Sequence, residues 1–251
     1  IINSSVLGLI FEKINGYKDG AFYTPGYITE YICRDVVRQA ILDKFYAVKG
    51  WKCNSLAELL EHFDYMKAED RQEVNDIINS IKICDPAVGS GHFLVAALNE
   101  MIYAKSVLHV LQYADNKERI KGYQVSIENG EIVLSTYNGQ PFKYNPDDDS
   151  KRVQQTLFEE KCCLIENCLY GVDLNRKSVD ICRLRLWIEL LKSIYYKPDE
   201  KGKPRLQILR NIDINIKCGN SLLSKFPVAI GKTLSSNTIS AEKIRDYRKN
   251  R

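Results

Sequence analysis

The chain has 251 residues, of which 45% are hydrophobic, so it can bury the core of one large α/β domain or two small ones. Its formal net charge of +4 permits a polyanionic partner without indicating one. The sequence shows no signal peptide and no apolar run of the ~18 residues that a membrane helix needs. Its eight cysteines lack the spacing of a zinc site. We therefore expect a soluble, cytoplasmic protein whose cysteines are mostly reduced and buried.

Residues 1–80 are predicted to form a mainly helical N-terminal layer, which opens with a helix at residues 6–14. A loop then ends in Tyr23, Thr24 and Pro25, where Thr24 is expected to cap the next helix and Pro25 to be its first residue. The apolar stripe predicted for this helix is Ile28, Ile32, Val36 and Ala40. Its N-terminus can hold a carboxylate, although an ordinary capped helix start explains the loop equally well.

Residues 81–110 predict a buried strand, a glycine-rich turn and a helix from Phe93 to about Val110. Asp85 ends the strand at the edge where open α/β sheets bind ligands, and Gly89 and Gly91 allow a close backbone approach. A dinucleotide fingerprint needs a glycine in place of Leu94, and a P-loop needs a lysine just after the glycines, so both are disfavoured. S-adenosylmethionine, with its ammonium group and ribose, fits this turn. A plain β-to-α turn without a ligand remains the alternative.

Residues 118–150 are predicted to form a β-hairpin inserted in the α/β core. Two β-rich runs flank Asn129 and Gly130, a pair typical of a tight primed turn. An acidic run at 147–149 is expected to close the insertion.

The core resumes with a short strand that ends at Asp173, where a carboxylate can accept two ribose hydroxyls. The helix that follows has an apolar face formed by Val179, Cys182, Leu186, Trp187, Leu190 and Leu191. Its basic residues are expected on the exposed face, as is usual for charges on a helix. They are Arg176, Lys177, Arg183, Arg185 and Lys192.

A third unit alternates apolar and polar residues at 212–218 and then turns at Asn220. The Asn220 amide can hydrogen-bond an adenine ring and Leu222 can cover the ring, although Gly-Asn-Ser is also an ordinary turn. Taken together, four ordered stretches resemble motifs of the gamma-class N6-adenine DNA methyltransferases, above all the type IIG and phage-exclusion-like restriction–modification branch. These stretches are residues 20–25, 85–91, 171–175 and 219–222.

This resemblance extends from about Leu7 to Leu223. It implies an α/β, Rossmann-like S-adenosylmethionine-dependent methyltransferase fold with a helical N-terminal layer and an inserted hairpin. The cofactor-binding core would occupy residues 81–231, and a charged tail residues 232–251.

The resemblance also assigns roles to residues, with no metal site. The loop before Gly26 would hold the methionine end of S-adenosylmethionine, the glycine turn its amine and ribose, and the last two motifs its ribose and adenine. The implied cofactor-binding residues are Tyr23, Thr24, Pro25, Asp85, Pro86, Ala87, Gly89, Ser90, Gly91, Asp173, Leu174, Asn220, Ser221 and Leu222. His92 is interpreted as a helix-start residue and not as a catalytic base.

One departure from the family pattern concerns catalysis. The family's Asn/Asp-Pro-Pro-aromatic motif is missing, because the 251 residues contain no Pro-Pro pair. We therefore expect a truncated adenine-specific enzyme that binds the cofactor without turnover, and whose full-length form acts on double-stranded DNA with fused or associated restriction and specificity domains. The alternatives are a methyltransferase for RNA or protein and a non-catalytic nucleic-acid-binding subunit.

Overall fold

The computed structural model describes residues 24–198, 203–207 and 215–222, together with Val6, Ile10 and Lys13. The chain divides into two compact units, Ile1–Asn220 and Ser221–Arg251. Tyr23, most of the predicted opening helix and the predicted charged tail therefore lie outside the described residues.

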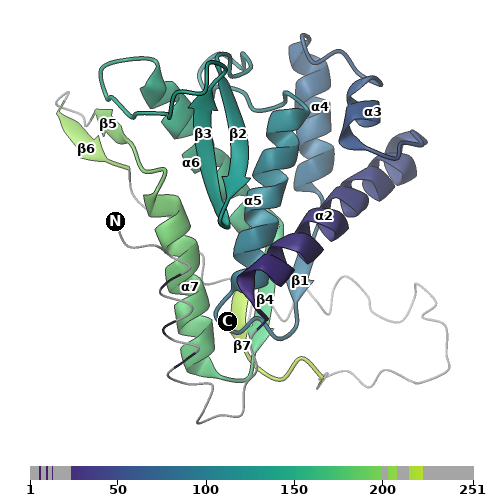
Figure 1. The fold of residues 1–251 in the computed structure, drawn as a ribbon, viewed down its shortest axis with the longest axis vertical. Helices are drawn as coiled ribbons and strands as arrows, with labels where there is room; N and C mark the ends of the chain where they lie inside the picture. The colour runs from purple at the N-terminus through teal and green to yellow at the C-terminus, as the bar shows by residue number, and fades with distance from the viewer. Residues whose placement is uncertain are drawn as a thin grey trace, which may run out of the picture. The chain divides into compact units, whose positions relative to one another are not determined.

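The described chain is a mixed α/β structure (Figure 1). Its helices are α2 (Gly26–Lys49), α3 (Leu56–Leu60), α4 (Ala68–Asn79), α5 (His92–Val107), α6 (Ser150–Asn167) and α7 (Arg176–Leu191). Its strands are β1 (Ile83–Asp85), β2 (Tyr123–Glu128), β3 (Glu131–Thr136), β4 (Leu169–Asp173), β5 (Tyr196–Pro198), β6 (Pro204–Leu206) and β7 (Ile216–Cys218). None of the described helices is both long and apolar enough to cross a membrane.

The strands β1, β4 and β7 form a parallel sheet in the order β1-β4-β7, which positions the starts of the three loops that follow them. Asp85 is in register with Gly171, and Asp173 with Cys218. Because all three strands run in the same direction, their carboxyl ends meet at one edge, which we call the carboxyl edge. Of the strand predicted at 212–218, β7 begins only at Ile216, and residues 208–214 lie outside the described part.

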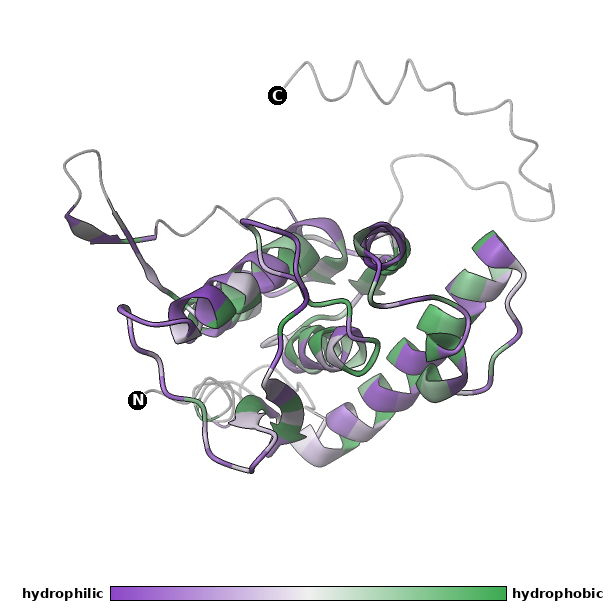
Figure 2. Cartoon of the chain, turned by 90° about the horizontal axis from the view of Figure 1, so that it is seen from above, coloured by the Kyte–Doolittle hydropathy of each residue, from purple (hydrophilic) through white to green (hydrophobic). Residues whose placement is uncertain are grey.

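The core is organised around α5, which contacts α2, α3, α6, α7 and both β1 and β4. Figure 2 shows this helix end on, with the other helices around it. Its side chains Leu94, Leu98, Met101 and Ile102 are fully buried, so α5 is apolar on nearly all sides, as a helix enclosed by its neighbours should be.

The predicted start and apolar stripe of α2 are both wrong. Pro25 is the N-cap residue, Gly26 is the first helical residue, and no side chain caps the helix. The buried face lies one position further along, at Thr29, Cys33, Val37, Ile41 and Phe45, because this is the face that packs on α5. Ile32 and Val36 are instead exposed to 39% and 61%.

The prediction that all basic residues of α7 are exposed is wrong for Arg185, which is only 1% exposed. Trp187 and Leu191, predicted to face the core, are exposed, while Cys182 and Leu186 are buried. The apolar stripe of α7 is thus narrower than predicted, and a buried guanidinium occupies one position within it. Fewer cysteines are buried than expected, since Cys84 and Cys218 are among those exposed.

Strands β2 and β3 pair antiparallel around Asn129 and Gly130, whose φ angles of 51° and 75° are those of a type I′ turn. The pair lies alongside α5 (Figure 1). A partly buried charge network also ties it to the end of α7 and to α6. Lys192 bonds both Glu131 and Glu189, and the buried Lys161 donates to the Glu189 carbonyl at 3.0 Å. That this hairpin is an insertion stays a prediction.

Neither helix α6 nor the short β5–β6 pair was predicted from the sequence. The N-terminus of α6 comes directly after the acidic run at 147–149. That run ends the loop of the hairpin and also precedes the N-terminus of a helix, where negative charge interacts favourably with the helix dipole.

Gly91 has a φ of +85°, and a Cβ added there would lie 2.7 Å from Cys182 Sγ. We expect Gly91→Ala to lower the free energy of unfolding by about 2–4 kcal/mol, the sum of a left-handed backbone and overpacking. Gly50→Ala is the matched control, because Gly50 has a φ of +73° and no atom within 4 Å of an added Cβ. Gly50→Ala should lower the free energy of unfolding, measured by urea denaturation, by only about 1 kcal/mol. Equal costs for the two variants would contradict the close packing of Gly91 on α7.

Candidate active site

The carboxyl edge brings together two acidic residues predicted to contact one ligand. Asp85 ends β1 and Asp173 ends β4, which are neighbouring strands. The glycine turn follows Asp85, and Gly219 N–H donates to the Asp173 carbonyl at 2.9 Å, so the start of the third loop lies at the same edge. Three of the four predicted motifs thus begin within one small region of the sheet.

Asp85 has one carboxylate oxygen that is satisfied and one that is not. Oδ1 accepts the Ala87 N–H at 3.0 Å. Oδ2 is buried and has no hydrogen-bond partner among the residues that the structure describes. Burial raises the pKa of Asp85, the Ala87 N–H opposes the rise, and the nearby charge of Asp173 adds to it. A buried carboxylate oxygen without a donor is well suited to a cationic N–H group of a ligand.

The Asp173 carboxylate holds two loops together. Its Oδ2 accepts Gly89 N–H and its Oδ1 accepts Asn175 N–H, each at 2.8 Å. In addition, Val88 N–H donates to the Val172 carbonyl at 2.9 Å. Each carboxylate oxygen keeps a second lone pair, so Asp173 can still accept hydrogen bonds from a ligand while it supports the glycine turn.

Helix α7 holds the remaining part of the turn. Arg185 Nη1 donates to the Ser90 carbonyl at 3.1 Å and to Ser90 Oγ at 3.3 Å. Cys182, one helical turn earlier, packs against Gly91. Ser90 Oγ also lies 3.2 Å from His92 Nδ1 at the start of α5. Sequence reasoning did not identify Arg185 as part of the site. The available signal was its position three residues after Cys182, because residues three apart lie on the same face of a helix.

The remaining predicted site residues are exposed or half-buried. Pro86, Ala87 and Leu174 are exposed around the carboxyl edge, and so is Asn220. Thr24 is half-buried just before α2, whose second turn reaches the start of α5 through a 3.4 Å hydrogen bond from Cys33 Sγ to the Phe93 carbonyl. Ser221 and Leu222 belong to the second unit, where both are exposed.

An apolar cleft of about 300 Å³ lies beside Asp85. Its walls come from α2, β1, α5 and the start of the glycine turn and include Ile32, Val36, Ile83, Pro86 and Phe93. This explains why Ile32 and Val36 are apolar although they miss the core, because they line the cleft. Sequence reasoning assigned these two residues to the buried stripe and so did not identify the cleft.

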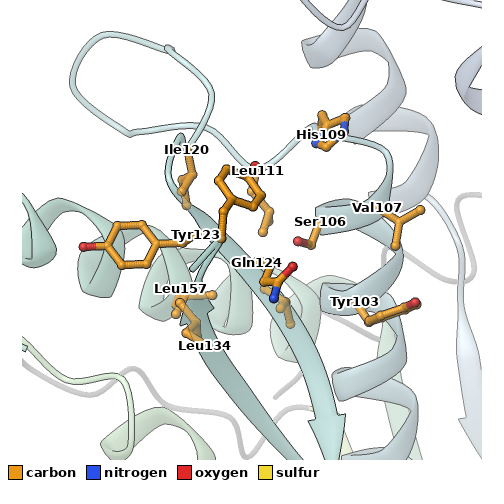
Figure 3. Close-up of a pocket in the computed structure, with 12 residues that line it drawn as sticks. Tyr103, Ser106, Val107, His109, Leu111, Ile120, Tyr123, Gln124, Leu134 and Leu157 are labelled. Carbon is orange, nitrogen blue, oxygen red and sulfur yellow. The ribbon is translucent and has the colours of Figure 1, made fainter. Parts of the chain in front are cut away.

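A second cavity, of about 280 Å³, lies between the end of α5, the β2–β3 hairpin and α6 (Figure 3). Its labelled polar side chains include Ser106, His109 and Gln124, and Leu134 and Leu157 lie among its apolar ones. It contains none of the predicted site residues.

Among the described residues, no group of three or more His, Cys, Asp or Glu side chains is arranged to hold a metal ion.

Comparison with known proteins identifies the family. Residues 62–239 match the family described as "MmeI, DNA-methyltransferase domain". The chain is also 30% identical over 238 residues to a protein of Methanocaldococcus jannaschii named "Putative type II restriction enzyme and methyltransferase". This match covers 88% of the chain but only 16% of that protein, so the chain spans a small part of its curated relative. No solved structure matches. The chain therefore belongs to the MmeI DNA-methyltransferase domain family and is a methyltransferase domain of the restriction–modification type.

Proposed function

We propose that this chain is the S-adenosylmethionine-binding part of a gamma-class enzyme that methylates adenine N6 in duplex DNA. The observation that carries the proposal is the buried Asp85 Oδ2 at the carboxyl edge of a parallel sheet, for which the described residues provide no donor. When bound, S-adenosylmethionine supplies a methyl group activated by its sulfonium. The ammonium group of the cofactor provides the N–H donors that Asp85 needs.

The other portions of the cofactor have partners in the same proposal. The cofactor approaches the backbone of the glycine turn at Gly89, while the missing side chain of Gly91 makes room for Cys182. The spare lone pairs of Asp173 accept the ribose hydroxyls. Asn220 hydrogen-bonds the adenine ring. The N-terminus of α2 receives the carboxylate of the methionine moiety, because no described side chain caps it and no acidic residue occupies its first turn.

The adenine to be methylated requires groups that this chain lacks. Such a base must be flipped out of the duplex and stacked in a pocket. The sequence contains no Asn-Pro-Pro-aromatic motif, and we propose that this motif reaches the site from chain outside the 251 residues. The open side of β1 supports this, since β1 pairs only with β4 in the described sheet and the apolar cleft lies along it.

The proposed partners follow from the family and the relative. Duplex DNA is the substrate that the family description implies. The relative combines a restriction enzyme and a methyltransferase in its name, and we extend that organisation to the full-length form of this protein as fused or associated restriction and specificity domains.

The cofactor proposal predicts that the chain binds S-adenosylhomocysteine and that Asp85→Asn weakens binding. Loss of a charge-assisted hydrogen bond of about 1.5–3 kcal/mol corresponds to a roughly tenfold to hundredfold higher Kd in calorimetry. The exposed Asp43→Asn on α2 is the matched control and should leave the Kd unchanged. No binding by the wild-type chain at high ligand concentration would defeat the proposal.

The raised pKa of Asp85 predicts opposite effects on binding and stability. Ligand affinity should fall as pH decreases through the raised pKa, because the ammonium group needs the ionised carboxylate. Ionised Asp85 destabilises the fold, and that cost is present above the folded-state pKa and absent below the unfolded-state value. Asp85→Asn should therefore raise the thermal midpoint at pH 7 and flatten the pH dependence of binding. A lowered midpoint would contradict this assignment.

The missing motif predicts that residues 1–251 transfer no methyl group to DNA. Incubation with duplex DNA and methyl-labelled S-adenosylmethionine should give no N6-methyladenine above background, even where calorimetry shows cofactor binding. Measurable N6-methyladenine would show that other residues of this chain handle the base.

A further inference from the structure

Arg185 occupies an unusual position for a charged residue. It is 1% exposed and is the largest fully buried side chain of the described residues, on a face of α7 whose neighbours Cys182 and Leu186 are apolar. Burying a charge is costly unless specific hydrogen bonds compensate it. An apolar side chain would fill the same space without that cost, so packing alone does not explain a guanidinium here.

The hydrogen bonds of Arg185 reach the glycine turn. One nitrogen, Nη1, contacts both the carbonyl and the hydroxyl oxygen of Ser90, at 3.1 and 3.3 Å. Ser90 lies between Gly89 and Gly91, whose φ angles are 52° and 85°. Glycines with positive φ allow the backbone many other conformations, so a turn flanked by two of them needs an external anchor.

The guanidinium also lies near the two acidic residues of the site. Burial raises the pKa of the Cys182 thiol to about 12, the charge of Arg185 lowers it, and the charges of Asp85 and Asp173 raise it. All three charges therefore act on the same sulfur. Arg185 thus supplies buried positive charge close to two carboxylates that repel each other.

We propose that Arg185 is a positioning residue, which fixes Ser90 and with it the whole glycine turn in the conformation that receives S-adenosylmethionine. This inference rests on the proposed cofactor. Arg185 acts through Ser90 and does not contact the ligand. Because the turn is ordered before the ligand arrives, binding does not have to supply the free energy of ordering it.

The test compares Arg185→Met and Arg185→Lys with Lys105→Met. Lys105 is the matched control, a fully buried cation on α5 that donates to Asn79 and Glu160, away from the glycine turn. Arg185→Met should raise the Kd for S-adenosylhomocysteine at least about tenfold, and Arg185→Lys should recover part of the loss by restoring one donor. Lys105→Met should lower the thermal midpoint, because it breaks a buried ion pair, and should leave the Kd within about twofold, because that pair does not contact the glycine turn.

Nuclear magnetic resonance separates positioning from stability. In the ligand-free chain, Arg185→Lys should shift the amide resonances of Gly89 and Gly91, and Lys105→Met should not. Ser90→Ala, which removes only the hydroxyl acceptor, should raise the Kd by a smaller factor than Arg185→Met. Should Arg185→Met fail to fold, Arg185→Lys and Ser90→Ala carry the test alone.

The proposal is overturned by unchanged glycine resonances together with an unchanged Kd in Arg185→Lys and Ser90→Ala. An equal loss of affinity in Lys105→Met would also overturn it, because a general loss of stability would then explain both variants. If the wild-type chain binds no S-adenosylhomocysteine, the cofactor assignment fails, whereas the resonances of ligand-free Arg185→Lys still show whether Arg185 fixes the turn.

Discussion

The site depends on one hydrogen bond, from Gly89 N–H to the carboxylate of Asp173. It joins the loop after β1 to the loop after β4, so the two motifs that look separate in the sequence are one structure. The β4–α7 unit supports each residue of the turn in succession, with Asp173 at Gly89, Arg185 at Ser90 and Cys182 at Gly91. A change at any of these positions on β4 or α7 is therefore also a change in the glycine turn.

This arrangement concentrates unfavourable electrostatics where a ligand would relieve them. Two carboxylates on neighbouring strands repel each other, and burial disfavours the ionised form of Asp85 in particular. Backbone N–H donors and a buried guanidinium compensate part of this, but no residue in the described part of the chain donates to Asp85 Oδ2. Strain of this kind is expected at a binding site, because a cation there stabilises both the complex and the fold.

The sequence predicted the parts that local patterns determine. The two short apolar strands before Asp85 and Asp173 carry their own signals, since a strand followed by a turn residue needs no knowledge of its neighbours. Long-range packing decided the rest. Helix α2 has apolar residues on two faces, and only the position of α5 selects the buried one. The burial of Arg185 likewise depends on a turn almost a hundred residues earlier in the chain. Helix α6 went unpredicted because its many polar residues obscure its apolar face.

The separation in sequence of the parts of the site has a kinetic meaning. The hydrogen bonds that hold the turn connect residues 84 and 95 positions apart, across the β2–β3 hairpin and α6. Closing a longer loop adds little to the equilibrium cost, about 0.6 kcal/mol per doubling of length. Contacts of such long range nevertheless form slowly. The glycine turn should thus reach its final shape only after β4 and α7 have joined β1, so that a partly folded chain has the motif in its sequence but no site in its structure.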